Sequence, residues 1–221
     1  NDKTKAFRDF ALEGLISIAP DSCKIAKEIK GSVKEKTLIG SNITSLLSVS
    51  GFSNLEKLKV KNTNISTVSD LSRLKNLKTL LFTDNPELKN LSGISSLDNL
   101  ELLGIRNCKS LTDLSHVSGF KKLSGIQVND CGITSTNGLK NLPLLKNINF
   151  NDNSYLERID EIGQISSLEI VTISGCPNIK SLDALTKLAN LSFLRVDKHN
   201  LQNTEGISSL IKPLMEGLRK E

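Results

Sequence analysis

The sequence predicts an α/β fold: one right-handed solenoid of stacked repeats whose strands line up as a parallel, concave β-sheet. The first observation is self-similarity with a period of 22 or 23 residues, which marks a stacked-repeat architecture. The second is the pattern within each unit, where a strand-like alternation of apolar residues precedes apolar residues spaced three apart. The third is composition, because 221 residues with no Trp and one Tyr must build an aliphatic core.

Each repeat opens on an apolar residue that recurs at this spacing. The openers are Leu55, Leu77, Leu100, Leu123, Leu145, Leu168 and Leu191, and Val33 opens a weaker first unit. Three and five residues after an opener stand two more apolar residues, as expected of a strand with one buried face. Lys36 interrupts this pattern and indicates that the first coil is a transition into a cap. A lone unit cannot bury its apolar side, so about eight coils must stack.

Residues 77–85 follow the pattern Leu-x-x-Leu-x-Phe-x-x-Asn. This motif resembles the signature of leucine-rich-repeat proteins, and the short unit is most similar to the bacterial internalin type. The nuclear phosphatase-regulator type has similar units. The resemblance covers residues 33–213 and implies a module that binds another protein, not an enzyme.

The resemblance also gives the cysteines a place. Eight residues after its opener, a unit of this family carries a buried Asn or Cys that bonds backbone groups at the turn leaving the strand. Here that structural ladder is formed by Asn85, Cys108, Cys131, Asn153 and Cys176, with Ser41, Thr63 and His199 in the same place elsewhere. We therefore expect thiols at these positions, although two disulfides or a metal site are the alternatives that four cysteines raise. No Cys-x-x-Cys motif supports zinc.

The two ends of a solenoid expose apolar surface and need covers. Residues 1–32 have apolar residues at helical spacing on either side of Pro20, which predicts a helical N-terminal cap. Residues 33–213 form the coils, and residues 214–221 are expected to be a short C-terminal helix and tail. No change in composition divides the chain, so all three parts belong to one domain. A separate signalling helix pair at the N-terminus is the alternative.

Side chains between the buried strand positions should point outward from the concave face. Among them are a basic run, an apolar pair on neighbouring coils, and a second apolar pair beside an arginine. The candidate partner-binding residues are Lys57, Lys59, Lys61, Leu81, Leu102, Arg106, Gln127, Asn149, Ile170, Phe193 and Arg195. Exposed apolar residues with an adjacent arginine are typical of protein-binding hot spots. The alternatives are that the lysines form an ordinary solvated face and that Phe193 packs under the C-terminal cap.

Other classes of function lack support in the sequence. The net charge of +5 is scattered, which argues against nucleic acid, and no apolar run reaches the length of a membrane span. No catalytic motif is present, and the two histidines fall on different parts of the repeat. We expect a monomer without catalytic residues, metal or cofactor, and without membrane insertion.

The leading hypothesis is a protein-binding module of a bacterial surface or secreted protein, of adhesin or virulence type. An intracellular subunit that binds an enzyme such as a phosphatase is the second hypothesis. A purely architectural segment is the third. An extracellular, cell-surface or periplasmic location is preferred over the cytoplasm.

Overall fold

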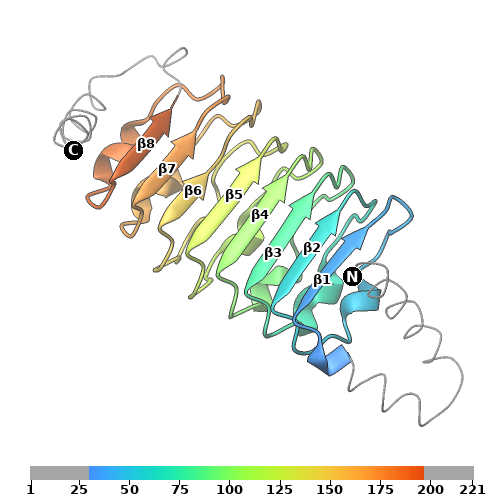
Figure 1. Cartoon of the computed structure of the whole chain (residues 1–221). Coiled ribbons are helices and arrows are strands. Elements are labelled where there is room, and N and C mark those ends of the chain that lie inside the picture. Colours follow the sequence, from blue (N-terminus) through green and yellow to red (C-terminus); the bar gives the residue numbers. More distant parts are fainter. Residues whose placement is uncertain (1–29, 197–221) are drawn as a thin grey trace, which may run out of the picture.

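A computed structural model describes residues 30–196 of the chain. It contains one sheet of eight parallel strands that lie side by side in chain order (Figure 1). The strands are β1 (Glu35–Ile39), β2 (Lys57–Lys61), β3 (Thr79–Thr83), β4 (Leu102–Arg106), β5 (Gly125–Asn129), β6 (Asn147–Asn149), β7 (Ile170–Ile173) and β8 (Phe193–Val196). Each strand falls in one predicted unit, so the leucine-rich-repeat solenoid expected from the sequence is confirmed.

The expected caps fall almost entirely outside this range. Residues 30–32 are helical and end the segment expected to form the N-terminal cap. The rest of that cap, the end of the last coil and the expected C-terminal helix at 214–221 lie outside the described residues.

Strand pairing keeps equivalent repeat positions side by side. Leu80 of β3 pairs with Leu103 of β4, and Leu81 pairs with Gly104. The same offset of 22 or 23 residues links every neighbouring pair from β1 to β8, so each outward position forms a column across the sheet. At about 4.8 Å per strand, these columns give side chains far apart in the sequence a common surface.

The side of the solenoid opposite the sheet consists of short 3-10 helices instead of α-helices. They are η1 (Leu47–Val49), η2 (Ser69–Arg73), η3 (Ile94–Ser96), η4 (Ser115–Val117), η5 (Asp160–Gln164) and η6 (Asp183–Lys187). Apolar residues three apart suit this helix because it has three residues per turn. Residues 134–144 contain no such turn. There Thr136 occupies an otherwise apolar position, and its buried hydroxyl donates to Glu161 at 2.9 Å.

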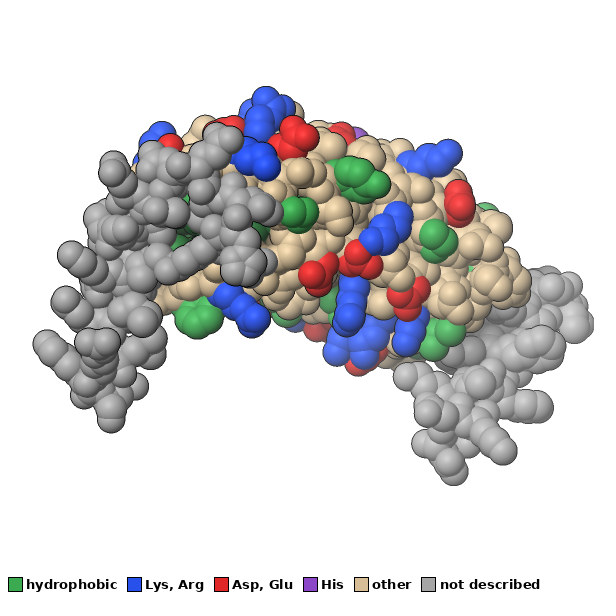
Figure 2. All heavy atoms as spheres, turned by 90° about the horizontal axis from the view of Figure 1, so that it is seen from above, with side chains coloured by type: hydrophobic (Ala, Val, Ile, Leu, Met, Phe, Trp, Pro, Cys, Tyr) green, Lys and Arg blue, Asp and Glu red, His purple; other side chains and the backbone are tan. Residues whose placement is uncertain are grey.

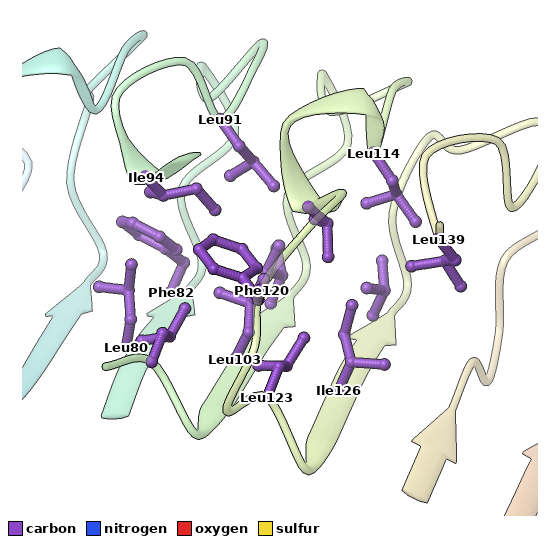
Figure 3. Close-up of a cluster of buried hydrophobic side chains, with 14 of the residues drawn as sticks. Leu80, Phe82, Leu91, Ile94, Leu103, Leu114, Phe120, Leu123, Ile126 and Leu139 are labelled. Atoms are coloured by element: carbon purple, nitrogen blue, oxygen red, sulfur yellow. The ribbon is translucent and has the colours of Figure 1, made fainter. Parts of the chain in front are cut away.

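The core lies between the sheet and these turns and runs without a break from coil to coil. Figure 3 shows strand residues such as Phe82 and Leu103 facing Leu91 and Ile94 from the turns. The openers Leu55, Leu77, Leu100, Leu123, Leu145 and Leu168 are fully buried, as the repeat predicts. Each such side chain contributes about 1.5–3 kcal/mol by leaving water, so the stack of coils is the main source of stability.

A column of left-handed residues ends the strands, and the sequence analysis did not identify it. The residues seven after each opener have φ between 52° and 59° and are Asn62, Asp84, Asn107, Asp130 and Asp152. Gly40 and Gly175 take the same place in the first and seventh coils, also with positive φ. Asn, Asp and Gly are the residues that tolerate this conformation. Their recurrence just before the ladder position was the sequence signal for it.

Asn62 offers a test of this turn because its side chain makes no hydrogen bond to the rest of residues 30–196. We expect Asn62→Gly to stay within about 0.5 kcal/mol of the wild-type free energy of unfolding, and Asn62→Val to lose about 1–2 kcal/mol. Urea unfolding measures both. Thr67→Val, at an exposed position without positive φ, is the control and should be close to wild type. Equal losses for both Asn62 variants would show that backbone conformation does not select this residue.

Candidate functional site

All eleven candidate partner-binding residues lie on strands β2 to β8, at outward positions of the sheet. We call this surface the sheet face, defined by the outward side chains of β1 to β8. It divides into a charged end on β1 and β2, a central hollow that spans β3 to β7, and an apolar and basic end on β8. The structure therefore brings Leu81, Leu102, Gln127, Asn149 and Ile170 together and leaves the lysines of β2 to one side.

The charged end is less basic than the sequence indicated. The carboxylate of Glu35 on β1 lies 3.0 Å from the ammonium of Lys59 and 3.6 Å from that of Lys57. The hydrogen bond from Lys59, with help from Lys57, holds the pKa of Glu35 below its usual range. Lys61 forms no ion pair within residues 30–196. Glu35 was missed because it belongs to the weak first unit, although its position two after Val33 would have placed it in the same column as Lys57.

A second carboxylate joins three coils at the edge of this end. Glu56 accepts hydrogen bonds from Lys34 at 2.6 Å and from Lys78 at 2.8 Å. These two bonds, first that of Lys34 and then that of Lys78, lower the pKa of Glu56 to about 2. Lys78 is thus held in an ion pair, and it adds little free positive charge to the sheet face.

The lowered pKa of Glu56 predicts a pH dependence of stability. A carboxylate whose folded pKa is depressed stabilises the fold above its ordinary pKa and loses that contribution as pH falls towards its folded value. We therefore expect the wild type to be more stable than Glu56→Gln at pH 6, and the difference to disappear between pH 4.5 and about 2. Because the group is exposed, the effect is small and shrinks in high salt. Thermal unfolding over this pH range measures it, and a difference that persists at pH 2 would contradict it.

The central hollow has a volume of about 350 Å³. Leu81, Leu102 and Ile170 supply its apolar wall, and the carboxamides of Gln127 and Asn149 lie between them. Leu102 is 47% exposed and Ile170 39% exposed, so both can contact a partner. Isolated exposed leucines mean little on a protein surface, but three aliphatic side chains around one hollow form a contiguous apolar area.

Two glycines explain the shape of this hollow. A Cβ atom on Gly104 would lie 2.6 Å from Cδ2 of Leu81, and one on Gly125 would lie 2.8 Å from Cδ2 of Leu102. Each leucine therefore leans across the glycine that pairs with it on the next strand. The apolar pair that the sequence predicted and the two glycines beside it therefore make one site.

Three carboxamides in the hollow have no hydrogen-bond partner among the described residues. The side chains of Gln127, Asn147 and Asn149 donate and accept no hydrogen bond within residues 30–196, and the enclosed Oδ1 of Asn149 is left unsatisfied. Asn129 and Asn151, further along the same two coils, instead accept backbone N–H groups of the next coil at 3.0 Å. Because a buried amide oxygen without a partner costs free energy, the Oδ1 of Asn149 is better explained by contact with a ligand than by stability, and the exposed carboxamides of Gln127 and Asn147 beside it are free to join that contact.

Strand β8 continues the apolar wall and adds charge. Phe193, which is 49% exposed, pairs with Ile170 across β7 and β8, and Arg195 pairs with Thr172. On the other side of the hollow, the exposed Arg106 stands two residues after Gly104 on the same face. Neither arginine forms an ion pair with any residue of the described coils.

The ladder asparagines lie on the buried side and tie each coil to the preceding one. Asn85 accepts the N–H of Thr63 at 3.2 Å and its hydroxyl at 2.6 Å, and donates to the carbonyl of Val60 at 3.0 Å. Asn153 repeats this arrangement with Cys131 N–H at 2.9 Å and the carbonyl of Val128 at 2.6 Å. Both asparagines are completely buried, so these bonds satisfy backbone groups that water cannot reach.

The ladder cysteines are thiols bonded to backbone carbonyls. Cys108 donates to Arg106 at 3.5 Å, Cys131 to Asn129 at 3.3 Å, and Cys176 to Phe150 at 3.2 Å. The contact with Cys108 and burial raise the pKa of the Cys131 thiol, which keeps it protonated and unreactive.

Other parts of the described chain offer no comparable site. No group of three His, Cys, Asp or Glu side chains within residues 30–196 is placed to hold a metal ion. His116 lies on η4, away from the sheet face, and His199 lies outside the described residues. No helix within this range is long and apolar enough to cross a membrane. Figure 2 shows basic and acidic side chains interspersed on the surface seen from above.

Comparison with known proteins agrees with this architecture. A model of the leucine-rich-repeat domain of endo-β-N-acetylglucosaminidase EndoS matches residues 71–176. Internalin C2 from Listeria monocytogenes is similar in structure over 83% of this chain and 80% of its own, with a TM-score of 0.71 and 18% identity. The leucine-rich-repeat domain of the type III effector XopL is similar over 87% of this chain and 88% of its own, with a TM-score of 0.53 and 16% identity. No curated protein matches the sequence of the chain.

These likenesses, together with the eight stacked strands, define the class of protein. The chain folds as a leucine-rich-repeat solenoid. This fold is similar to that of internalin C2, in agreement with the resemblance of the short unit to the internalin type.

Proposed function

We propose that the chain is a binding module that holds a partner protein against its sheet face, with the central hollow as the main contact. The observation that carries this proposal is the hollow itself: exposed Leu102 and Ile170 on either side of carboxamides, among them the unsatisfied Oδ1 of Asn149. Protein interfaces concentrate their binding energy in such places, where an apolar anchor is surrounded by polar groups that the partner satisfies.

The lining of another depression supports the choice of the central hollow as the main contact. A larger depression of about 630 Å³ lies between the turns near η5 and η6, but it is lined by Glu157, Arg158, Asp160, Lys180 and Asp183. Mixed, solvated charges without an apolar centre contribute little to affinity. The lining of the central hollow, by contrast, combines aliphatic side chains and carboxamides and includes no charged residue.

The partner that we favour is a protein met by a surface or secreted protein of adhesin or virulence type. Support comes from the resemblance of the short unit to internalins and from the similarity in fold to internalin C2. A regulatory subunit that binds an enzyme such as a phosphatase would use the same face, and the identity of the captured partner distinguishes the two roles.

Site-specific photo-crosslinking tests the proposal. A photoreactive amino acid is placed at Gln127 in the hollow, or at Leu144, which is 52% exposed in a turn outside the sheet face. Cells or host-cell surfaces are treated with each labelled protein, and the adducts are identified by mass spectrometry.

We expect one partner protein to be crosslinked from position 127 and absent from the position 144 sample. Adducts that form equally from both positions, or only from position 144, would overturn the sheet face as the binding site. The Leu144 variant controls for random capture, because it presents the same reactive group at a similarly exposed site of the same fold.

A further inference from the structure

We infer that the segment of the partner seated in the hollow is an extended acidic peptide that inserts one large apolar side chain. This inference rests on the proposed function and adds the chemistry of the partner. It follows from the size of the hollow, from the unpaired carboxamides, and from the sign of the free charges around them.

The size and lining of the hollow fit a large apolar side chain as anchor. About 350 Å³ is at the lower end of the range for ligand pockets, roughly 300–1,000 Å³. Its wall is aliphatic, from Leu81, Leu102 and Ile170, and Phe193 extends it on the next strand. An aliphatic or aromatic side chain therefore fits here, while a charged one would lose its hydration without gaining a partner.

The carboxamides indicate an extended backbone around that anchor. A carboxamide both donates and accepts hydrogen bonds, so it can pair with either group of a peptide bond. Gln127 on β5 and Asn147 and Asn149 on β6 line the hollow, and their side chains have no hydrogen-bond partner within residues 30–196. The absence of side chains at Gly104 and Gly125 opens the sheet next to them, so that a second backbone can approach.

The free charges on the sheet face are positive. From β4 to β8, the outward strand positions carry Arg106 and Arg195 and no carboxylate. Lys61 on β2 is a third cation without an ion pair within residues 30–196. Acidic side chains flank these strands in the sequence: Glu101 and Glu169 directly precede Leu102 and Ile170, and Asp130 and Asp152 follow β5 and β6. Glu169 is paired with Lys146, and Asp130 with Lys109. Acidic residues on both sides of the anchor would therefore complement the face.

Peptide selection tests this inference without knowledge of the partner. The probe is a phage library of random peptides of about 12 residues, which span roughly 40 Å when extended. The library is selected on the immobilised chain, and enriched peptides are synthesised. Their affinities for wild type and variants are then measured by fluorescence anisotropy at low and high salt.

We expect the enriched peptides to be net acidic with at least one large apolar residue. The double reversal Arg106→Glu/Arg195→Glu and the isosteric Gln127→Glu should each weaken binding by about tenfold or more, with a strong dependence on salt. The matched control is Arg73→Glu/Lys187→Glu, the same change of charge on η2 and η6, which should change binding less than about twofold.

The outcomes separate this inference from the proposed function. Failure to enrich any peptide, enrichment of neutral or basic peptides, or equal binding by wild type and the arginine double variant would overturn the acidic peptide. If neutral or basic peptides are enriched and they fail to bind Ile170→Asp, the hollow remains the binding site and only the chemistry of its occupant is wrong. Peptides that bind Ile170→Asp as well as wild type would contradict both.

Discussion

Asn85→Ala is expected to lower the free energy of unfolding by about 3 kcal/mol, because it removes the bonds between two coils in the buried ladder. The N–H of Thr63 and the carbonyl of Val60 would both lose their partner at a site that water does not reach. Each buried group left unsatisfied costs about 1–3 kcal/mol. Chemical denaturation monitored by circular dichroism measures the change.

Asn85→Cys is the matched control for this prediction. Cysteine fills the same place in the coils of Cys108, Cys131 and Cys176, where its thiol donates to strand carbonyls. We expect this variant to lose about half as much stability as Asn85→Ala, since a thiol is a weaker donor. If alanine and cysteine were equally harmless at this position, the ladder would have no part in holding the coils together.

Phe82→Ala is expected to be still more destabilising, by about 3–5 kcal/mol. Phe82 on β3 is 1% exposed and lies between the sheet and the turns, close to Ile94 in Figure 3. Alanine would leave a cavity that stacked coils cannot close without shifting the strand register. Equilibrium denaturation gives the free energy directly.

Phe193→Ala serves as the control on another strand. This phenylalanine is 49% exposed on β8 and should lose less than about 1.5 kcal/mol. Comparable losses at the two positions would mean that burial, and with it the assignment of inward and outward strand positions, is misplaced.

The sequence predicted the solenoid well because one period determines both which residues are buried and how the strands pair. An opener such as Leu77 is buried because the position recurs, and the recurrence also fixes the strand register that forms the columns. Since a strand alternates between two faces, the inward residues also identified the outward ones, including Leu102 and Ile170.

The sequence could not predict how outward side chains pair with one another. Glu35 forms salt bridges with Lys57 and Lys59, and such pairs depend on rotamers of long side chains, which the repeat does not constrain. The same holds for Leu81 and Leu102, whose tilt over the neighbouring glycines shapes the hollow. The sequence shows which residues differ between coils, but the surface that they form depends on how their side chains pack against one another.

The structure of the segments opposite the sheet was predicted only in part. Apolar residues three apart predicted one or two helical turns, and the structure has 3-10 helices of three to five residues. A unit of 22 or 23 residues that already contains a strand is too short to return to the next strand through an α-helix. Residues 134–144 depart from this pattern, and there Thr136 stands at an otherwise apolar position and donates a hydrogen bond to Glu161.

The most direct test of the central claim, that the hollow binds the partner, is the affinity of Ile170→Asp for the protein crosslinked from position 127. Isothermal titration calorimetry compares it with wild type and with Leu144→Asp, which places the same charge on an apolar residue outside the sheet face. We predict that Ile170→Asp binds at least about tenfold more weakly, while Leu144→Asp binds like wild type, both with unchanged thermal unfolding profiles. Full affinity in a folded Ile170→Asp protein would contradict the assignment of the hollow as the binding site.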